Sequence, residues 1–359
     1  MTESMPLPDT PASDTPARHG YRAIARRKRL LLGLLAFVLL CSLLLDLALG
    51  SVRLGPWEVV QALLSPDSAP AQARVVVWDI RLPVALMAVV VGAALSLAGA
   101  QMQTILNNPL ASPFTLGISA AASFGAALGL AFGVRLFPVA AEYMLPLNAF
   151  VMAMLTALII HALSLRRGVT AETIVLLGIA LVFTFNALLA LVQYFATEQA
   201  VAAVVFWTMG SLTKATWTKL GITAAVLAAT LPLFMRRAWA LTALRLGDDK
   251  AASFGVDVRR LRLHTLVLVS LLAAFPVAFV GTIGFVGLVG PHIARLLIGE
   301  DQRFFLPASL LAGALILSLS SVVSKLLIPG TIFPIGVVTS LIGIPFFISL
   351  ILGGRRRAW

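Results

Sequence analysis

The sequence is poor in charge and in cysteine. Only 12% of its 359 residues are charged, whereas 60% are hydrophobic, and the mean hydropathy is +0.99. Soluble domains normally carry about 25% charged residues, so this composition excludes a soluble protein of this length. The one cysteine, Cys41, lies inside an apolar run, which excludes a disulfide framework and a CxxC metal or redox site.

Groups that could perform chemistry are also scarce. The four histidines (His19, His161, His264 and His292) are scattered, without the spacing of a metal site or of a base beside a nucleophile. A GxxxxGK[ST] phosphate loop is absent, so ATP is not bound in that way. We therefore expect a protein that is not an enzyme and that binds no metal or cofactor itself.

Two alternatives follow from other classes of membrane protein. A secondary transporter driven by an ion gradient would place an acid at mid-membrane or show interrupted helices in an inverted repeat. The acids here lie nearer the ends of the apolar segments, Asp46 and Glu172 included. A membrane enzyme would need a nucleophile or metal set, which the sequence does not display.

Apolar segments long enough to cross a bilayer, about 20 residues each, occupy most of the chain. They predict an all-α polytopic membrane protein with about ten transmembrane helices in one membrane domain, residues 30–354. The predicted spans are 30–50, 82–104, 114–134, 146–165, 173–195, 217–235, 263–283, 285–299, 304–327 and 334–353.

The basic residues lie between the apolar segments rather than on one face, so the net charge of +12 does not indicate nucleic-acid binding. With the amino terminus inside, 20 of the 27 basic residues fall on the cytoplasmic side, which predicts both termini in the cytoplasm. Residues 1–29, rich in Pro, Ser, Thr and Asp, predict a disordered cytoplasmic tail. Residues 355–359 form a basic cytoplasmic end.

Small and polar residues interrupt several of the apolar segments. Small residues at four-residue spacing allow close helix packing, but they could equally line a transport pathway. Asn108-Pro109 breaks a helix where exposed backbone must be buried in protein or face a cavity. The helix-breaking or pathway residues are Gly92, Ser96, Gln101, Gln103, Pro109, Gly287, Gly290 and Pro291.

The inner loop, residues 236–262, is longer than a turn requires. Leu and Ala flank Gly247 and Gly255, and Asp248 and Asp249 stand where a helix would begin. The loop is therefore expected to form two short helices, a docking surface on the cytoplasmic face.

Five stretches together resemble the FecCD family of bacterial ABC importer permeases, which serves iron–siderophore complexes, haem and vitamin B12. They are RLP at 81–83, GAALSLAGAQMQTILNNPLASPFTLGIS at 92–119, LGDDKAASFGV at 246–256, GFVGLVGPHIARLLIG at 284–299 and FPIGVVTSLIGIPFF at 333–347.

The resemblance implies a ten-span type II ABC importer permease in the bacterial inner membrane. It further implies a homodimer, two cytoplasmic ATPase subunits that hold ATP-Mg, and a periplasmic substrate-binding protein. An iron–siderophore complex is the expected cargo, with haem or cobalamin as alternatives.

The resemblance also implies roles for individual residues. ATPase coupling falls on Leu246, Gly247, Asp248, Asp249, Ala252, Gly255 and Val256, and an inner gate on Asn108, Leu110, Ala171 and Glu172. Docking of the binding protein falls on Arg81 and Lys325. The sequence departs from the family pattern at Val84, Ser321 and Ile332, where the family usually has charged residues, so the outer docking surface is expected to differ.

Overall fold

A computed structural model describes residues 16–50, 54–67, 69–138, 140–164, 166, 170–328 and 331–353, and all regular elements within these ranges are helices. They are α1 (Pro16–Ala48), α2 (Pro56–Leu64), α3 (Ala71–Val75), the π-helix η1 (Val76–Arg81), α4 (Leu82–Ile105), α5 (Ile118–Phe132), α6 (Ala141–Ser164), α7 (Ala171–Phe195), α8 (Glu198–Thr208), α9 (Trp217–Arg236), α10 (Ala238–Leu244), α11 (Asp248–Ser253), α12 (Val258–Val280), α13 (Val286–Ile298), α14 (Gln302–Leu326) and α15 (Ile335–Gly353).

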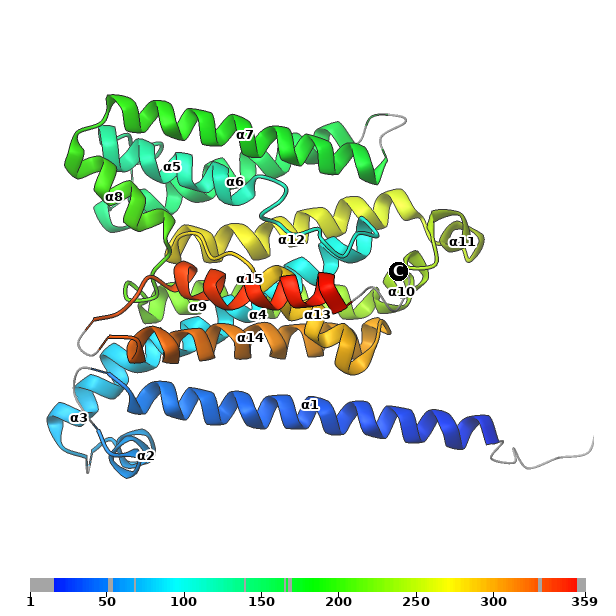
Figure 1. Ribbon diagram of the computed structural model, residues 1–359, viewed down its shortest axis with the longest axis horizontal. Helices are drawn as coiled ribbons and strands as arrows, with labels where there is room; N and C mark the ends of the chain where they lie inside the picture. Colours follow the sequence, from blue (N-terminus) through cyan, green and yellow to red (C-terminus); the bar gives the residue numbers. More distant parts are fainter. Residues whose placement is uncertain are drawn as a thin grey trace, which may run out of the picture.

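Seven helical stretches are long and apolar enough to cross a membrane, and α5, α13 and the described part of α15 are shorter apolar helices. The prediction of an all-α polytopic membrane protein is therefore confirmed. The helices run side by side along the long axis of the molecule (Figure 1). Helices α10 and α11 lie at one end, and α2, α3 and α8 lie at the other.

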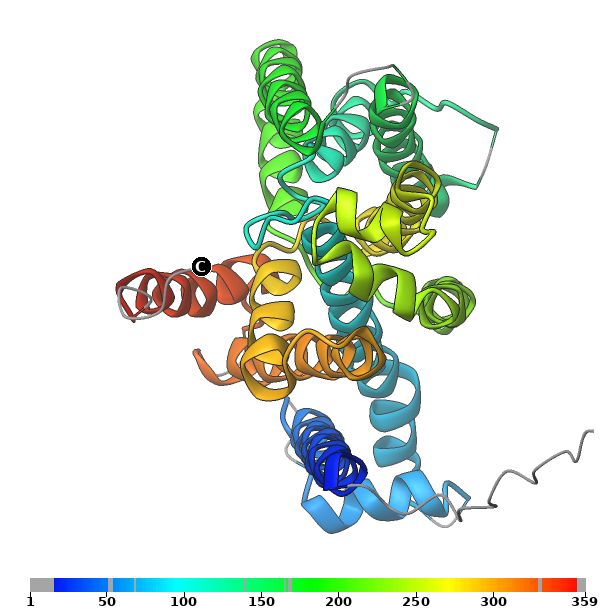
Figure 2. The ribbon, with the colours of Figure 1, turned by 90° about the vertical axis from the view of Figure 1, so that its right-hand side faces the viewer.

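Helix α4 occupies the centre of the bundle, where it contacts α9, α12, α13 and α14 (Figure 2). Helices α5 to α8 form a group on one side, and α1 packs against α14 on the opposite side. Helix α15 projects from the bundle and contacts α13 and α14.

The amino-terminal part differs from the prediction. Helix α1 begins at Pro16, so residues 16–29, expected to be disordered, are helical. Proline suits a first helical turn, and the Ala, Arg and Lys residues that follow favour helix. The disorder predicted for residues 1–15 and the basic end at 355–359 lie outside the described residues.

Two further helical regions were not among the predicted spans. The loop 51–80 contains α2. A further helical stretch begins in this loop at Ala71 and continues through α4 to Ile105. Helix α8 follows α7 directly, because Thr197 caps it by accepting a hydrogen bond from the Ala200 N–H.

Three non-helical segments meet in the half of the bundle near α8, opposite α10 and α11. Ser211 N donates to Val280 O at 2.7 Å, and Ile335 N donates to Gly210 O at 3.2 Å. A Cβ at Gly210 would lie 2.5 Å from Thr282 O, and one at Gly336 2.5 Å from Met209 O, so only glycine permits this approach. These hydrogen bonds pair backbone N–H and C=O groups of non-helical segments with one another. An apolar membrane environment requires such pairing.

Candidate functional site

The small residues of α4 serve packing rather than a pathway. A Cβ at Gly92 would lie 2.3 Å from Gly313 O on α14, and one at Gly99 would lie 1.7 Å from Gly287 O on α13. Ser96 is fully buried and donates to Ser309 O at 2.6 Å.

The pathway prediction is therefore wrong for Gly92, Ser96, Gln101, Gln103, Gly290 and Pro291, which are all buried within the subunit. Gly287 is half-buried against α4, and Pro109 is half-buried in the loop after α4. Small residues allow helix backbones to approach closely. Close packing therefore explains the four-residue spacing of small residues, which the sequence alone could assign equally to packing or to a pathway.

Polar groups at the end of α4 connect it to the neighbouring helices. Gln101 Nε2 donates to Gln302 Oε1 at 3.1 Å, and Gln302 Nε2 donates to Thr104 Oγ1 at 3.1 Å. The Gln302 backbone N–H donates to Thr242 Oγ1 of α10 at 3.3 Å. The buried glutamines thus join α4, α14 and α10.

Two arginines and one glutamate lie beside this glutamine cluster. Arg245 pairs with Glu300, and Arg295 Nε lies 3.0 Å from Glu300 Oε1. Arg295 Nη2 also donates to Gln103 Oε1 at 3.0 Å, and Arg245 Nη1 donates to Asn107 Oδ1 at 3.2 Å. Arg245, which follows α10, therefore reaches the loop that contains Asn108.

A third arginine, Arg262 of α12, connects α11 with the end of α4. Arg262 Nε donates to Ile105 O at 2.9 Å, which satisfies a carbonyl at the carboxyl end of that helix. Its Nη2 lies 3.1 Å from both Oδ1 and Oδ2 of Asp248. We call Arg245, Arg262, Arg295 and Glu300 the arginine cluster.

The predicted coupling residues gather on and around α11. The side chain of Leu246 is 56% exposed, and Asp248, Asp249, Ala252 and Gly255 are exposed, while Val256 packs on the apolar cluster beneath. Gly247 and Gly255 have φ values of 103° and 81°, which L-residues with side chains rarely adopt. Two neighbouring aromatics, Trp239 and Phe254, have ring centroids 6.5 Å apart and are also exposed.

The predicted inner gate is formed by two separate segments. Asn108 Oδ1 accepts a hydrogen bond from Leu110 N at 2.9 Å, and Leu110 is 51% exposed beyond this turn. Ala171 packs on the apolar cluster that contains Ala111, whereas Glu172 points to solvent at the start of α7. The gate role of all four residues stays a prediction.

The predicted docking residues are buried, so that prediction is wrong. Arg81 is 6% exposed, and its Nη1 donates to Leu47 O at 2.7 Å and Ala48 O at 3.1 Å. Lys325 Nζ lies 2.9 Å from Asp46 Oδ1. The last carbonyls of α1 lack helical partners, and the buried Asp46 carboxylate needs a counter-charge.

The departures from the family pattern have a partial explanation. Ser321 Oγ donates to Asp46 Oδ2 at 3.1 Å, so an acid from α1 occupies the place beside Ser321. Val84 packs on an apolar cluster that contains Ala88 and Val91 of α4. Ile332 is 59% exposed just before α15.

Sequence reasoning missed Arg245, Arg262, Glu300 and Gln302, which come from three separate parts of the chain. In the sequence, these residues are marked only by being charged or amide side chains that border apolar segments. Within the described part of the chain, no group of three or more His, Cys, Asp or Glu side chains could hold a metal ion.

The chain matches the FecCD transport family over residues 37–353. It is 36% identical to a hemin transport system permease protein of Yersinia pestis, covering 92% of this chain and 97% of that protein. It is 33% identical to a vitamin B12 import system permease protein of Vibrio cholerae, covering 93% and 96%.

Among solved structures, the fold is similar to that of a metal-chelate type ABC transporter in an inward-facing conformation. The TM-score is 0.79 at 30% identity, covering 90% of this chain and 99% of that chain. The architecture is therefore that of a type II ABC importer permease. The chain belongs to the FecCD transport family.

Proposed function

We propose that this ABC importer permease carries an iron–siderophore complex or a related chelate across the bacterial inner membrane, with haem or cobalamin as the alternative cargo. Hemin and vitamin B12 are named for relatives, and a metal chelate for the structural neighbour. The chain would act as a homodimer with two ATPase subunits, which hold ATP-Mg, and a periplasmic binding protein. Both termini would be cytoplasmic, which the distribution of basic residues supports.

The observation that carries the proposal is the arginine cluster. It joins an exposed surface on α10 and α11 to the end of α4 and to the loop that contains the predicted gate. Hydrogen bonds between charged groups are stronger than neutral ones and fix direction. A movement of α11 would therefore be passed to Ile105 and Asn107 rather than absorbed by a flexible loop.

The exposed aromatics fit the same role. Trp239 on α10 is 65% exposed, and Phe254, directly after α11, is 55% exposed, at the end of the bundle where these two helices lie (Figure 1). Aromatic side chains are enriched in the cores of protein interfaces. Together with Leu246 they would form the contact with the ATPase.

Gating follows from this connection. When ATP draws the two ATPase subunits together, the coupling helices of two permease copies would approach each other. Asn108 and Leu110 would then close the inner end of a path on the twofold axis.

The alternative of a secondary transporter receives little support. Asp46 is a buried acid, as that mechanism needs, but its carboxylate is already bound by Lys325 and Ser321. Uptake that survives an inactive ATPase partner but is abolished by an ionophore would restore this alternative.

The test is to break the coupling surface in the complete transporter in proteoliposomes. Gly247→Pro, or deletion of Asp248 and Asp249, should abolish chelate uptake while membrane insertion is retained and ATP hydrolysis no longer responds to the loaded binding protein. Arg135→Gln, an exposed residue in the loop after α5, is the control and should behave as wild type. Normal uptake and normally stimulated hydrolysis in the coupling variants would contradict the proposal.

A further inference from the structure

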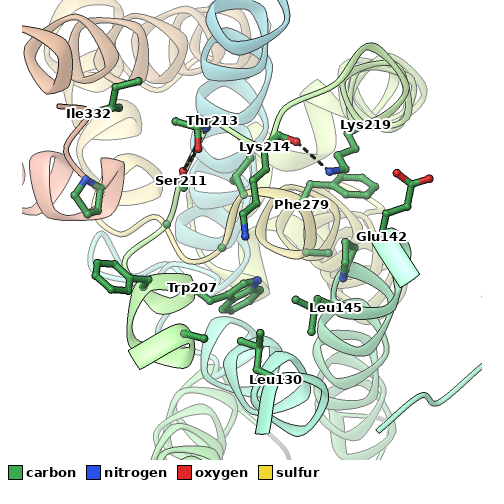
Figure 3. Close-up of a pocket in the computed structure, with 18 of the residues that line it drawn as sticks. Leu130, Glu142, Leu145, Trp207, Ser211, Thr213, Lys214, Lys219, Phe279 and Ile332 are labelled. Atoms are coloured by element: carbon green, nitrogen blue, oxygen red, sulfur yellow. Dashed lines mark hydrogen bonds between the residues drawn. The ribbon is translucent and has the colours of Figure 1, made fainter. Parts of the chain in front are cut away.

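A cavity of about 750 Å³ lies at the end of the molecule opposite the coupling helices (Figure 3). Its walls come from the end of α5, the start of α6, the end of α8, the loop 209–216 with the start of α9, the end of α12 and the segment 332–334 before α15. Cavities of about 300–1,000 Å³ hold ligands of ordinary small-molecule size. The volume therefore suits a metal chelate or a large part of one.

One cation extends into this cavity. Figure 3 shows the Lys214 side chain pointing from its loop into the middle of the space, towards the indole of Trp207. Among the described residues, the Lys214 ammonium has no hydrogen-bond acceptor and no ion-pair partner, and neither does the Trp207 Nε1–H group. Two donors thus face the same space.

The other charged groups of the cavity do not compete for the same position. Lys219 Nζ donates to the Lys214 carbonyl at 3.0 Å, so it holds the loop. The Glu142 carboxylate points away from the cavity centre (Figure 3). Lys214 therefore sets the charge that a ligand would meet.

The loop that bears Lys214 is held in place before any ligand arrives. Ser211 N is bonded to Val280 O, and the Ser211 and Thr213 hydroxyls lie 2.8 Å apart. A binding group that is already positioned loses little conformational freedom on binding.

The remaining walls are apolar. Leu130 and Leu145 line the side opposite the loop, and Phe279 lies beside Lys219. Apolar walls lower the local dielectric constant, which strengthens the attraction between an ammonium and an anion. The cavity thus combines one cation with a large apolar surface.

We propose that this outer cavity binds the permease's cargo directly, through an anionic group, a carboxylate or phenolate of the chelate, held by Lys214 beside Trp207. The inference rests on the proposed function and narrows its cargo to chelates with a net negative charge. An anionic lipid headgroup offers similar chemistry, and an acid of the binding protein is a further candidate partner for Lys214. The experiments below separate both from the chelate.

Binding is measured with gallium(III) citrate, a colourless anionic chelate, by calorimetry on the full-length permease in neutral phosphatidylcholine nanodiscs without the binding protein. Wild type should bind saturably. Lys214→Gln should weaken binding at least about tenfold, the loss of one charged hydrogen bond. Lys214→Arg should retain it, and Arg135→Gln is the matched control for removing an outer cation.

Two results would overturn the assignment. One is equal binding, or none, in wild type and Lys214→Gln. The other is a Lys214→Gln variant that loses co-purified phosphatidylglycerol or affinity for the binding protein while gallium citrate binding is unchanged.

Uptake in the complete transporter separates this inference from the proposed function. Lys214→Gln should lose uptake of an anionic ferric chelate and keep uptake of a neutral ferric tris(hydroxamate). If wild type takes up neither chelate, the proposed function fails; if the variant takes up both as wild type does, only the role of Lys214 fails.

Discussion

At the scale of single residues, the buried Asp46 carboxylate shows how this protein holds a charge inside a bundle that faces lipid. Lys325 and Ser321 bind its two oxygens from α14, and Arg81 covers the carbonyls that follow it. Breaking a buried pair costs about 3–5 kcal/mol because one charge stays buried alone, whereas replacing both members by apolar residues is often neutral.

We therefore expect Lys325→Met to lower the free energy of unfolding by about 3–5 kcal/mol. The double variant Lys325→Met with Asp46→Leu should recover most of this loss. Denaturant unfolding in detergent, with exposed Lys250→Met as control, measures both effects. A single variant as stable as wild type would show that the pair is not needed for the fold.

Glycine contacts on α4 give a second prediction at this scale. Gly99→Ala would place a Cβ 1.7 Å from the Gly287 carbonyl oxygen, which is backbone and cannot move aside. We expect a loss of about 1–3 kcal/mol or more from overpacking. Gly221→Ala on α9 has no atom within 4 Å of the new Cβ and is the matched control. It should be neutral or slightly stabilising in the same thermal unfolding measurement.

At the scale of elements, the arginine cluster lies between the proposed ATPase contact on α10 and α11 and the proposed gate at the end of α4. Arg245→Gln removes the ion pair with Glu300 and weakens the bond to Asn107 while leaving α10 and α11 exposed as before. ATPase subunits should still co-purify and hydrolyse ATP, but chelate uptake per ATP should fall at least about tenfold, as expected for the loss of charged hydrogen bonds. Loss of the ATPase subunits from the purified complex would instead assign Arg245 to docking.

The elements differ in how far the sequence predicts them. Hydropathy identifies α4, α7, α12 and α14 well, because each is a long apolar run. It does not identify α8, which is short and lies beside another apolar helix. Charges at the ends of runs were assigned to an outer surface, but Arg81 and Lys325 are buried because α1 ends between them, a proximity that sequence spacing cannot show.

At the scale of the whole molecule, the proposed functions require that the two ends of the bundle face opposite sides of the membrane. Lys250 lies on α11 and Thr213 lies beside the outer cavity, at opposite ends of the bundle. In a Cys41→Ser background, Lys250→Cys should react with a membrane-impermeant maleimide only from the cytoplasmic side, and Thr213→Cys only from the periplasmic side. Labelling of both from one side would contradict the ten-span topology with both termini in the cytoplasm.

The close backbone contacts at Gly210 and Gly336 also affect how the protein is made. The carbonyl groups of Met209 and Gly210 receive hydrogen bonds from Gly336 and Ile335 at the start of α15, which follows the earlier helices during synthesis. Until α15 enters the membrane, those carbonyls lack these partners in an apolar environment, at a cost that favours its arrival. A chain truncated before Ile335 should therefore insert its earlier helices yet remain open at this junction, a substrate for membrane proteases.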